Sequence, residues 1–293
     1  MTNGYQLGLI GYPIDHSLSP FLHNQFLKMV AINGMYHLFP VHPAQSPEQK
    51  IRSLLERMRL QELDGLNVTV PYKEMVLPLV DQATPDAEAI GAANLIYRSG
   101  DCLFAGNADA DAFIHDLRRL TPAHPPRHKN RALVLGAGGA ARAVVYGLLK
   151  QQWNVHITSR RPSHAKEVAN HFSRIGQVTP APFNEDTFST EYQLIINATT
   201  AGMFPDHETS AWPARKPLPA QAKLYDLVYN PVETPIIKKA RAAGLTALNG
   251  WGMLIEQAAI SFEIWTGVKI NRSSLLKRLE KNGIHSERNI HGA

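Results

Sequence analysis

Short apolar runs and longer amphipathic segments alternate along this chain. Short, largely apolar runs predict strands at residues 6–11, 132–135, 154–158, 194–197 and 224–229, an alternating run predicts a strand at 66–70, and a further candidate lies at 245–248. Segments of helical periodicity predict helices over residues 46–59 and from Gly139 to about Gln151. Strands that alternate with helices are typical of a parallel sheet with crossover helices, so the pattern predicts an α/β fold.

A proline-rich polar stretch separates two parts of the chain. Residues 121–130 read Thr-Pro-Ala-His-Pro-Pro-Arg-His-Lys-Asn, which is typical of a connection between domains. Before this stretch, Ser19 and Pro20 predict a helix start, with Ser19 as the N-cap and Pro20 at the first helical position. After Gly250 the pattern becomes purely helical, with a strong run over residues 253–265.

Composition places the chain among globular proteins with ample core material. Hydrophobic residues make up 44% of its 293 residues and charged residues 19%, and this length accommodates two ordinary domains. The single cysteine, Cys102, excludes an internal disulfide and cannot by itself build a thiolate metal site. The chain shows neither a secretory signal pattern nor an apolar run of membrane-spanning length, so we expect a cytoplasmic protein with no membrane partner.

The net charge of +5 is compatible with nucleic-acid binding, but the distribution of the basic residues along the chain disfavours such binding. Lys and Arg residues are dispersed along the chain rather than gathered into a run. An anionic small substrate together with a phosphorylated cofactor accounts for a mild positive charge equally well. We therefore expect a small-molecule substrate and no nucleic-acid partner.

Two further classes of chemistry lack their motifs. Asp15, His16 and Ser17 stand together, but no Gly-x-Ser-x-Gly elbow is present to expose a serine nucleophile. The 13 histidines show neither an HExxH helix nor a Cys/His spacing suited to zinc. The sequence therefore predicts neither a serine hydrolase nor a metal site.

A glycine-rich turn after the apolar run 132–135 is the feature that points most directly to a ligand. Gly136, Gly138 and Gly139 are followed by small residues that suit a helix. A strand, a turn with such glycines and a helix allow backbone amides and the helix N-terminus to approach a pyrophosphate. The pattern favours dinucleotide binding, and packing is the alternative reason for such a turn.

The end of the next predicted strand indicates which dinucleotide is bound. An acidic residue there holds the ribose 2′-hydroxyl of NAD, whereas an arginine accommodates the 2′-phosphate of NADP. The chain has Thr158, Ser159, Arg160 and Arg161 at this point, with no carboxylate. Guanidinium groups match phosphate oxygens in a bidentate way, so NADP is favoured, with NAD possible. Ordinary loop arginines are the alternative interpretation.

Polar residues around the predicted strand 66–70 are candidates for acid–base chemistry. Asn67 and Thr69 share one face of the strand, and Lys73 follows just past its end. A lysine at this place either presents a protonated donor to a substrate carbonyl or is an ordinary surface lysine. Asp109 would orient the ammonium if the two side chains met, but sequence spacing does not place them together.

Gln257 lies in the apolar stripe of the predicted C-terminal helix, together with Leu254, Ala258, Ser261 and Trp265. A buried glutamine needs hydrogen-bond partners, so it either satisfies backbone groups or reaches a ligand. The sequence pattern alone does not decide between these two roles.

A series of motifs extends from residue 8 to about residue 268. They are Gly11-Tyr-Pro-Ile-Asp-His-Ser-Leu-Ser-Pro20 continuing to His23-Asn24, Asn67-Val-Thr-Val-Pro-Tyr-Lys73, Gly91-Ala-Ala-Asn94, Gly106-Asn-Ala-Asp109, Gly136-Ala-Gly-Gly-Ala-Ala-Arg-Ala143, Asn197-Ala-Thr199, Asp226-Leu-Val-Tyr-Asn-Pro231 through Thr234-Pro235, and Met253-Leu254 to Gln257. In this order they resemble the shikimate dehydrogenase family, which includes shikimate and quinate dehydrogenases.

The resemblance implies an oxidoreductase that interconverts 3-dehydroshikimate and shikimate with NADP, in aromatic amino acid and chorismate biosynthesis. It also implies two domains. Residues 1–111 and 250–293 would form an α/β substrate-binding catalytic domain, to which the C-terminal helices return. Residues 112–249 would form a Rossmann-like NADP-binding domain, and the enzyme would be a monomer or a homodimer.

Site residues follow from the matching motif positions. Lys73 and Asp109 match the catalytic pair, in which the lysine acts as proton donor or as electrostatic clamp for the developing oxyanion. The positions that match substrate contacts are Ser17, Ser19, Asn67, Thr69, Asn94, Tyr229 and Gln257. The positions expected to bind the cofactor are Gly136, Gly138, Gly139, Ala140, Ser159, Arg160, Arg161, Thr199 and Gly252.

Two positions depart from the family pattern and leave the substrate open. Leu95 and Ala108 stand where the family usually has threonines, after Asn94 and before Asp109. Each change removes a hydroxyl near the expected substrate site, and we hypothesise that Leu95 fills space that Ala108 vacates. Quinate or a related cyclohexane carboxylate, perhaps used with NAD, is the alternative substrate. A non-catalytic metabolite sensor is a third interpretation, which the retained Lys73 and Asp109 disfavour.

Overall fold

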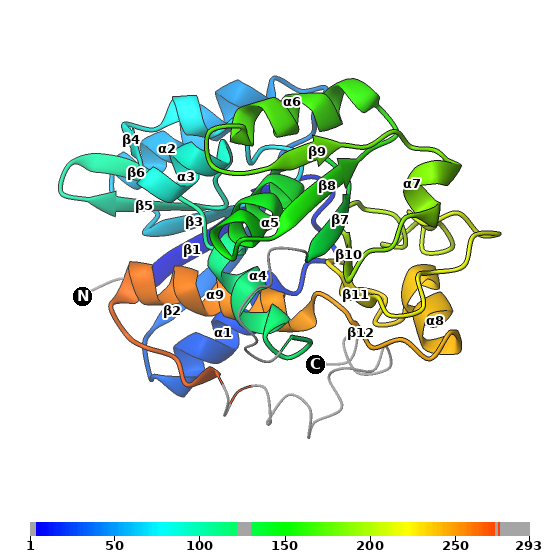
Figure 1. Cartoon of the computed structure of the whole chain (residues 1–293). Helices are drawn as coiled ribbons and strands as arrows, with labels where there is room; N and C mark the ends of the chain where they lie inside the picture. Colours follow the sequence, from blue (N-terminus) through cyan, green and yellow to red (C-terminus); the bar gives the residue numbers. More distant parts are fainter. Residues whose placement is uncertain (1–3, 122–129, 273–274, 276–293) are drawn as a thin grey trace. The chain divides into compact units, whose positions relative to one another are not determined.

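The computed structural model describes residues 4–121, 130–272 and 275, and it divides into two compact units (Figure 1). The described part of unit 1 is residues 4–109 and 255–272, and that of unit 2 is residues 110–121, 130–254 and 275. The connection predicted at 121–130 lies almost wholly outside the described residues, as does most of 273–293. The chain instead passes between the units inside helices, at Asp109–Ala110 and at Leu254–Ile255.

Unit 1 contains a mixed sheet with the strand order β2-β1-β3-β5-β6-β4. β1 is parallel to both β2 and β3, whereas β5 is antiparallel to both β3 and β6. The strands are β1 (Tyr5–Gly11), β2 (Gly34–Pro40), β3 (Gly65–Val68), β4 (Gln82–Ala83), β5 (Leu95–Ser99) and β6 (Cys102–Gly106). The helices are α1 (Ser19–Met29), α2 (Pro47–Arg59), the 3-10 turn η1 (Leu77–Leu79), α3 (Pro85–Ile90) and most of α9 (Trp251–Thr266).

Helices cover the sheet of unit 1 because they present apolar stripes to it. α2 buries a stripe with i, i+3, i+4, i+7 spacing that begins at Ile51. α1 and α9 lie side by side (Figure 1), with Phe26 edge-on to Phe262 at a ring distance of 5.5 Å. Trp265 lies so close to Gly65 that a Cβ there would come within 2.3 Å of the indole, so this strand position requires glycine.

Unit 2 is built on a sheet with the strand order β12-β11-β10-β7-β8-β9, in which every pairing is parallel. The strands are β7 (Arg131–Leu135), β8 (Asn154–Thr158), β9 (Val178–Pro180), β10 (Leu194–Asn197), β11 (Lys223–Asp226) and β12 (Ala247–Leu248). The helices are α4 (Asp109–Leu117), α5 (Gly139–Lys150), α6 (Pro162–Phe172), α7 (Glu185–Ser189) and α8 (Pro235–Ala242). This is the doubly wound order of a Rossmann-like domain, and the strand order reverses between β7 and β10.

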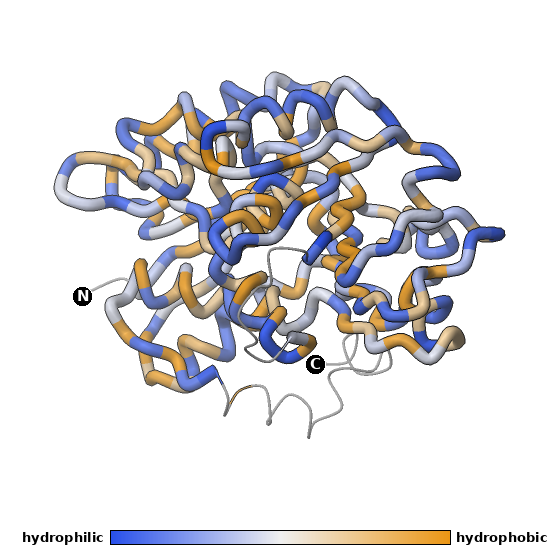
Figure 2. Tube along the Cα trace, viewed as in Figure 1, coloured by the Kyte–Doolittle hydropathy of each residue, from blue (hydrophilic) through white to orange (hydrophobic). Residues whose placement is uncertain are grey.

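The central strands of unit 2 are apolar because helices cover the sheet. Every residue of β10 is buried, and β7 exposes only Arg131 (Figure 2 colours most of both strands as hydrophobic). Phe188 and Trp212 pack edge to face at 4.9 Å in a cluster that includes Leu224 and Ile236. No helix among the described residues is long and apolar enough to span a membrane.

The predicted α/β fold is confirmed, and three local predictions are wrong. Ser19 does not cap α1: Leu18 is the N-cap, and the Ser19 amide donates to Oγ of Ser17 at 3.3 Å. The strand predicted over 66–70 ends at Val68, before a turn closed by the Tyr72 amide. The strand predicted over 224–229 ends three residues early at Asp226, whose carboxylate turns the chain by accepting the amide of Val228.

Candidate active site

Two charged side chains that are distant in the sequence form a short ion pair in unit 1. Nζ of Lys73 donates to Oδ2 of Asp109 at 2.5 Å, and the two side chains are only 12% and 5% exposed. Lys73 follows β3, and Asp109 is the first residue of α4. The structure thus makes the pairing that sequence spacing left open, in a place where little water screens it.

Two asparagines hold Asp109 in a single orientation. Asn94 donates from Nδ2 to Oδ1 of Asp109 at 2.8 Å, and its own Oδ1 accepts the amide of Ala108 at 2.8 Å. Asn107 accepts the Asp109 amide at 2.9 Å. Because Asn94 occupies one carboxylate oxygen, the other faces the ammonium of Lys73, and rotation of the carboxylate would break both bonds.

Asn67 links the surroundings of this pair to β2 and α9. Its Nδ2 donates to the carbonyl of Asn94 at 3.0 Å and to Oγ of Ser261 at 2.8 Å, and its Oδ1 accepts the hydroxyl of Tyr36 at 2.9 Å. Both amide hydrogens are therefore engaged inside unit 1, and only Oδ1 keeps a lone pair for a ligand. Ser261 in turn donates to the carbonyl of Gln257 at 2.9 Å. Tyr36 and Ser261 were not predicted as site residues.

Three more of the predicted substrate residues follow the carboxyl ends of β1 and β3, which are adjacent and parallel. Ser17 and Ser19 follow β1, and their hydroxyls lie 3.2 Å apart. Thr69 follows β3, and its amide donates to the carbonyl of Ile10 at 2.8 Å. Its methyl packs against Gly11, where a Cβ would come within 2.3 Å. The segments after these two strands are thus in contact.

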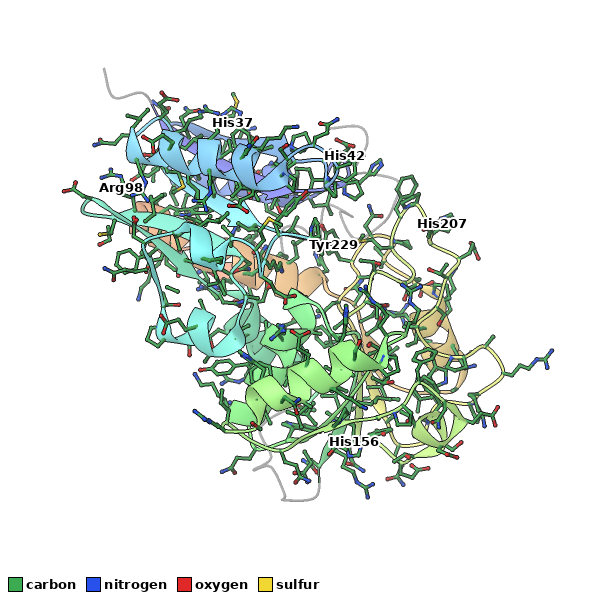
Figure 3. All side chains as sticks on the ribbon, turned by 90° about the horizontal axis from the view of Figure 1, so that it is seen from above. His37, His42, Arg98, His156, His207 and Tyr229 are labelled. Carbon is green, nitrogen blue, oxygen red and sulfur yellow. The ribbon has the colours of Figure 1, made fainter. Side chains whose placement is uncertain are left out.

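The last two predicted substrate residues belong to different units. Gln257 lies in unit 1 on α9, together with the Lys73–Asp109 pair. Tyr229 lies in unit 2 on the loop that follows β11 (Figure 3). The candidate substrate residues therefore divide between the unit with the ion pair and the unit with the parallel sheet.

The glycine turn after β7 fits the pyrophosphate of a dinucleotide. Gly136 has a φ of +110°, and a Cβ on Gly138 would meet no atom within 4 Å, so the backbone there is open to a ligand. α5 begins at Gly139, its N-cap offers no side chain, and its first turn, which includes Ala140, has no acidic residue. The uncapped amides and the helix dipole favour an anion. The turn also lies where the strand order reverses, the usual ligand position in such sheets.

Cationic side chains stand at the end of β8, as the sequence predicts. Arg160 and Arg161 are exposed, and α6 begins directly after them with no acidic residue in its first turn. Ser159 donates from its hydroxyl to the carbonyl of Arg161 at 2.5 Å, which shapes the loop. The absence of a carboxylate and the presence of two guanidinium groups fit the 2′-phosphate of NADP.

Thr199 and Gly252 complete the predicted cofactor residues. Thr199 follows β10 and borders the glycine turn, since a Cβ on Gly136 would lie 3.0 Å from its methyl. A Cβ on Gly252 would lie 2.0 Å from Oδ1 of Asp116, so this position requires glycine. Asp116 also accepts the hydroxyl of Tyr225 at 2.7 Å and was not singled out in the sequence.

The described residues contain no group of three or more His, Cys, Asp or Glu side chains that could hold a metal ion. Within unit 2, for example, His156 and His207 lie far apart (Figure 3).

Comparison with known proteins agrees with this geometry. The shikimate dehydrogenase substrate-binding domain matches residues 9–96, and the shikimate 5′-dehydrogenase C-terminal domain matches residues 250–280. The shikimate dehydrogenase (NADP(+)) of Shouchella clausii is 37% identical over 92% of this chain and 96% of its own length. The chain belongs to the shikimate dehydrogenase family. The resemblance seen in the ordered motifs is thereby confirmed.

Solved structures of the family share the fold. The shikimate dehydrogenase of Thermus thermophilus, in complex with NADP(H) and shikimate, is 31% identical with a TM-score of 0.80 and covers 94% of this chain and 99% of that one. The quinate dehydrogenase of Corynebacterium glutamicum, in complex with NAD, is 28% identical with a TM-score of 0.82 and covers 95% and 99%. The same fold thus carries different substrates and cofactors, which local residues select.

Proposed function

We propose that this protein catalyses the reversible, NADP-dependent reduction of 3-dehydroshikimate to shikimate. The observation that carries the proposal is the buried Lys73–Asp109 ion pair, in a chain 37% identical to a shikimate dehydrogenase (NADP(+)). A spectrophotometric assay with shikimate and quinate, each with NADP and NAD, tests it. We expect dominant turnover with shikimate and NADP. Preference for quinate or NAD, or no turnover, would contradict the proposal.

In this mechanism Lys73 stabilises the developing negative charge and transfers the proton. NADPH, when bound, supplies the hydride that adds to the carbonyl carbon. The Lys73 ammonium stabilises the oxyanion that develops and then donates a proton to it. In the reverse direction its amine accepts the hydroxyl proton. Asp109 fixes the direction of the ammonium from 2.5 Å, and Asn94 fixes Asp109.

We assign most of the substrate site to residues 1–111 and 250–293 and most of the cofactor site to residues 112–249, with Tyr229 and Gly252 as the exceptions. The ion pair and its asparagine network support the first assignment, and the parallel sheet with its open glycine turn supports the second. The residues that would hold the ring hydroxyls and the carboxylate are Ser17, Ser19, Asn67, Thr69, Asn94, Gln257 and Tyr229. Both members of the ion pair come from one chain, so a monomer or a homodimer with independent sites suffices.

Removing the two guanidinium groups after β8 should weaken NADP binding selectively. We expect the double variant Arg160→Ala/Arg161→Ala to raise the Kd for NADP by about tenfold or more, because charge-assisted bonds to the 2′-phosphate are lost. The Kd for NAD should change little, and both constants can be measured by fluorescence titration. Arg174→Ala, an exposed arginine of the same unit, serves as the control. Equal losses for the two cofactors would contradict the assignment.

Leu95 and Ala108 are expected to tune the choice of substrate. Both are buried in unit 1, Leu95 on β5 opposite Gly106 and Ala108 beside Asp109. We expect Leu95→Thr/Ala108→Thr to raise kcat/KM for shikimate relative to quinate by about tenfold, because a site hydroxyl discriminates between ligands by roughly 1–3 kcal/mol. Leu103→Thr on β6 controls for the loss of a buried leucine. An unchanged ratio would remove these positions from the specificity determinants.

A further inference from the structure

Asp226 is a fully buried carboxylate that the mechanism above does not use. It ends β11, and its Oδ1 accepts Nδ2 of Asn197 at 2.8 Å and the amide of Val228 at 3.0 Å. Its Oδ2 accepts the hydroxyl of Thr234 at 2.5 Å. These groups come from β10, from the loop after β11 and from the start of α8, and all of them are uncharged donors. In its ionised, acceptor-only form the dehydrated carboxylate accepts all three donors.

Asn197 carries this arrangement into the loop after β10. Because its Nδ2 must face Asp226, its Oδ1 points the other way and accepts both the amide and the hydroxyl of Thr199, at 3.1 and 2.6 Å. The same Nδ2 also donates to the carbonyl of Ala201 at 3.2 Å. The Thr199 hydroxyl then accepts the Ala201 amide at 3.1 Å. The ionised carboxylate therefore selects one orientation of the Asn197 amide and, through it, one conformation of the loop.

That loop packs directly against the glycine turn of the proposed pyrophosphate site. A Cβ on Gly136 would lie 2.9 Å from the carbonyl oxygen of Ala198 and 3.0 Å from the methyl of Thr199. On its other side the loop meets α8, where a Cβ on Gly202 would lie 3.0 Å from Thr234. A shift of the loop at Ala198 and Thr199 would therefore disturb the glycine turn, and a shift at Gly202 would disturb the start of α8.

We infer that Asp226 is a positioning residue for NADP, which holds the 198–202 loop, and through it the Gly136 turn, in the conformation that binds the pyrophosphate. The inference rests on the proposed function of unit 2. A neutral side chain of the same shape carries a hydrogen where Oδ2 accepts the Thr234 hydroxyl, so that hydroxyl has to turn and accept instead. The bonds from Asn197 and Val228 to Oδ1 then lose their charge assistance.

The titration of Asp226 gives this role a pH signature. Burial raises the pKa of Asp226 from 3.8 to about 6, against the lowering effect of its hydrogen bonds from Thr234, Val228 and Asn197. No charged or titratable side chain of the described residues contributes to this pKa. The carboxylate is thus ionised at pH 8 and largely neutral at pH 5.5. Asp226→Asn reproduces the neutral form at both pH values.

The test compares NADP dissociation constants of wild type and Asp226→Asn at pH 8 and pH 5.5 by fluorescence titration. At pH 8 we expect the variant to bind NADP about tenfold more weakly, because hydrogen bonds to a charged group become weaker bonds to a neutral one and the Thr234 hydroxyl has to reverse. At pH 5.5 the ratio of the two constants should fall toward one, because wild type is then mostly protonated. The ratio also cancels the titration of the cofactor's own phosphate.

Thermal unfolding separates this role from simple stabilisation. A raised pKa in the fold means that ionisation of Asp226 lowers stability as the pH rises from 3.8 to about 6. Asp226→Asn should therefore unfold at no lower temperature than wild type at pH 8, although it binds NADP more weakly. A residue with a merely structural role would instead lower both the unfolding temperature and the affinity.

Matched threonine variants keep the inference testable if Asp226→Asn fails to fold. Thr234→Val removes the hydroxyl that faces Asp226 and should weaken NADP binding, whereas Thr234→Ser should retain it. Thr187→Val removes another buried hydroxyl of unit 2, which donates to Pro182 at 2.6 Å, and should leave the Kd unchanged. Wild-type affinity in Asp226→Asn or Thr234→Val at pH 8, or a ratio independent of pH, would overturn the inference. Failure of wild type to bind NADP would instead overturn the proposed function.

Discussion

Replacing Lys73 with alanine is expected to lower kcat by about a hundredfold to ten-thousandfold, the usual contribution of a positioned general acid. The ammonium is the group that meets the developing oxyanion, and Asp109 cannot replace it because a carboxylate repels that charge. NADP binding should be unchanged, since the proposed cofactor residues lie in unit 2. Steady-state assays with shikimate, combined with fluorescence titration of NADP, measure both quantities.

Two further variants serve as a control and separate proton donation from electrostatic stabilisation. Lys28→Ala removes an exposed lysine of the same unit and should leave kcat unchanged. Lys73→Arg keeps the positive charge but replaces a compact ammonium by a planar fork of different reach, so it should restore little activity if proton donation is the main role. Substantial rescue by arginine would favour the electrostatic clamp. Retention of more than a tenth of wild-type kcat by Lys73→Ala would refute the catalytic assignment and favour a metabolite sensor.

The second large effect concerns His23, which should make the protein sensitive to acid. The imidazole is fully buried on α1, stacks on Tyr36 at 4.3 Å and lies against the rings of Phe26 and Trp265. Neither ring nitrogen makes a well-formed hydrogen bond within the described residues. Burial lowers the pKa of His23 from 6.5 to about 3. The interaction with the side chain of Asn67 raises this pKa but offsets only part of the lowering. A charged imidazole is therefore strongly disfavoured in this aromatic cage.

The direction of the pH effect follows from proton uptake. Below pH 6.5 the unfolded chain binds a proton at His23, whereas the folded protein does not do so until about pH 3. Stability is therefore lost as the pH falls through this window. At pH 4.5 the loss amounts to roughly 2–3 kcal/mol from this one group. Asp226 acts in the opposite direction between about pH 6 and 3.8, so the effect of His23 is best isolated by a variant.

His23→Leu should remove this sensitivity. Leucine suits the aromatic surroundings and leaves no unpaired ring nitrogen, so the variant is expected to be about as stable as wild type at pH 7. At pH 4.5 its free energy of unfolding should exceed that of wild type by roughly 2–3 kcal/mol, measured by urea denaturation. His37→Leu, at a half-buried position on β2 of the same unit (Figure 3), should keep the acid lability of wild type. Parallel pH profiles for His23→Leu and wild type would contradict the prediction.

The strands that could be predicted are those with a strong local pattern. β10 has the predicted bounds because all four of its residues are buried and the three before Asn197 form one apolar run. β2 was not predicted, since it is an edge strand in which only Tyr36 is fully buried, and its pattern therefore shows no alternation. The predicted strand extends past the end of β11 because no local sequence feature indicates that the Asp226 carboxylate accepts the backbone amide of Val228.

The site residues likewise divide into those that a local sequence motif marks and those that no motif marks. Ordered motifs singled out Lys73 and Asp109, which the structure pairs, and the glycine turn and the arginines after β8 indicated a phosphorylated cofactor. Tyr36, Ser261 and Asp226 were not predicted as functional residues. A single buried polar residue looks like many others in a sequence, and its role depends on partners that other elements supply.

The sequence by itself determined the fold class, the family and the chemical types of the site residues, because periodicity, turn chemistry and short motifs are local properties. Only the tertiary structure decided which polar side chains meet. Lys73 and Asp109 are 36 residues apart, and Asn67 and Ser261 are 194 residues apart. Such pairs form because the packing of strands and helices removes them from water, which leaves each buried donor dependent on whichever acceptor the fold brings to it.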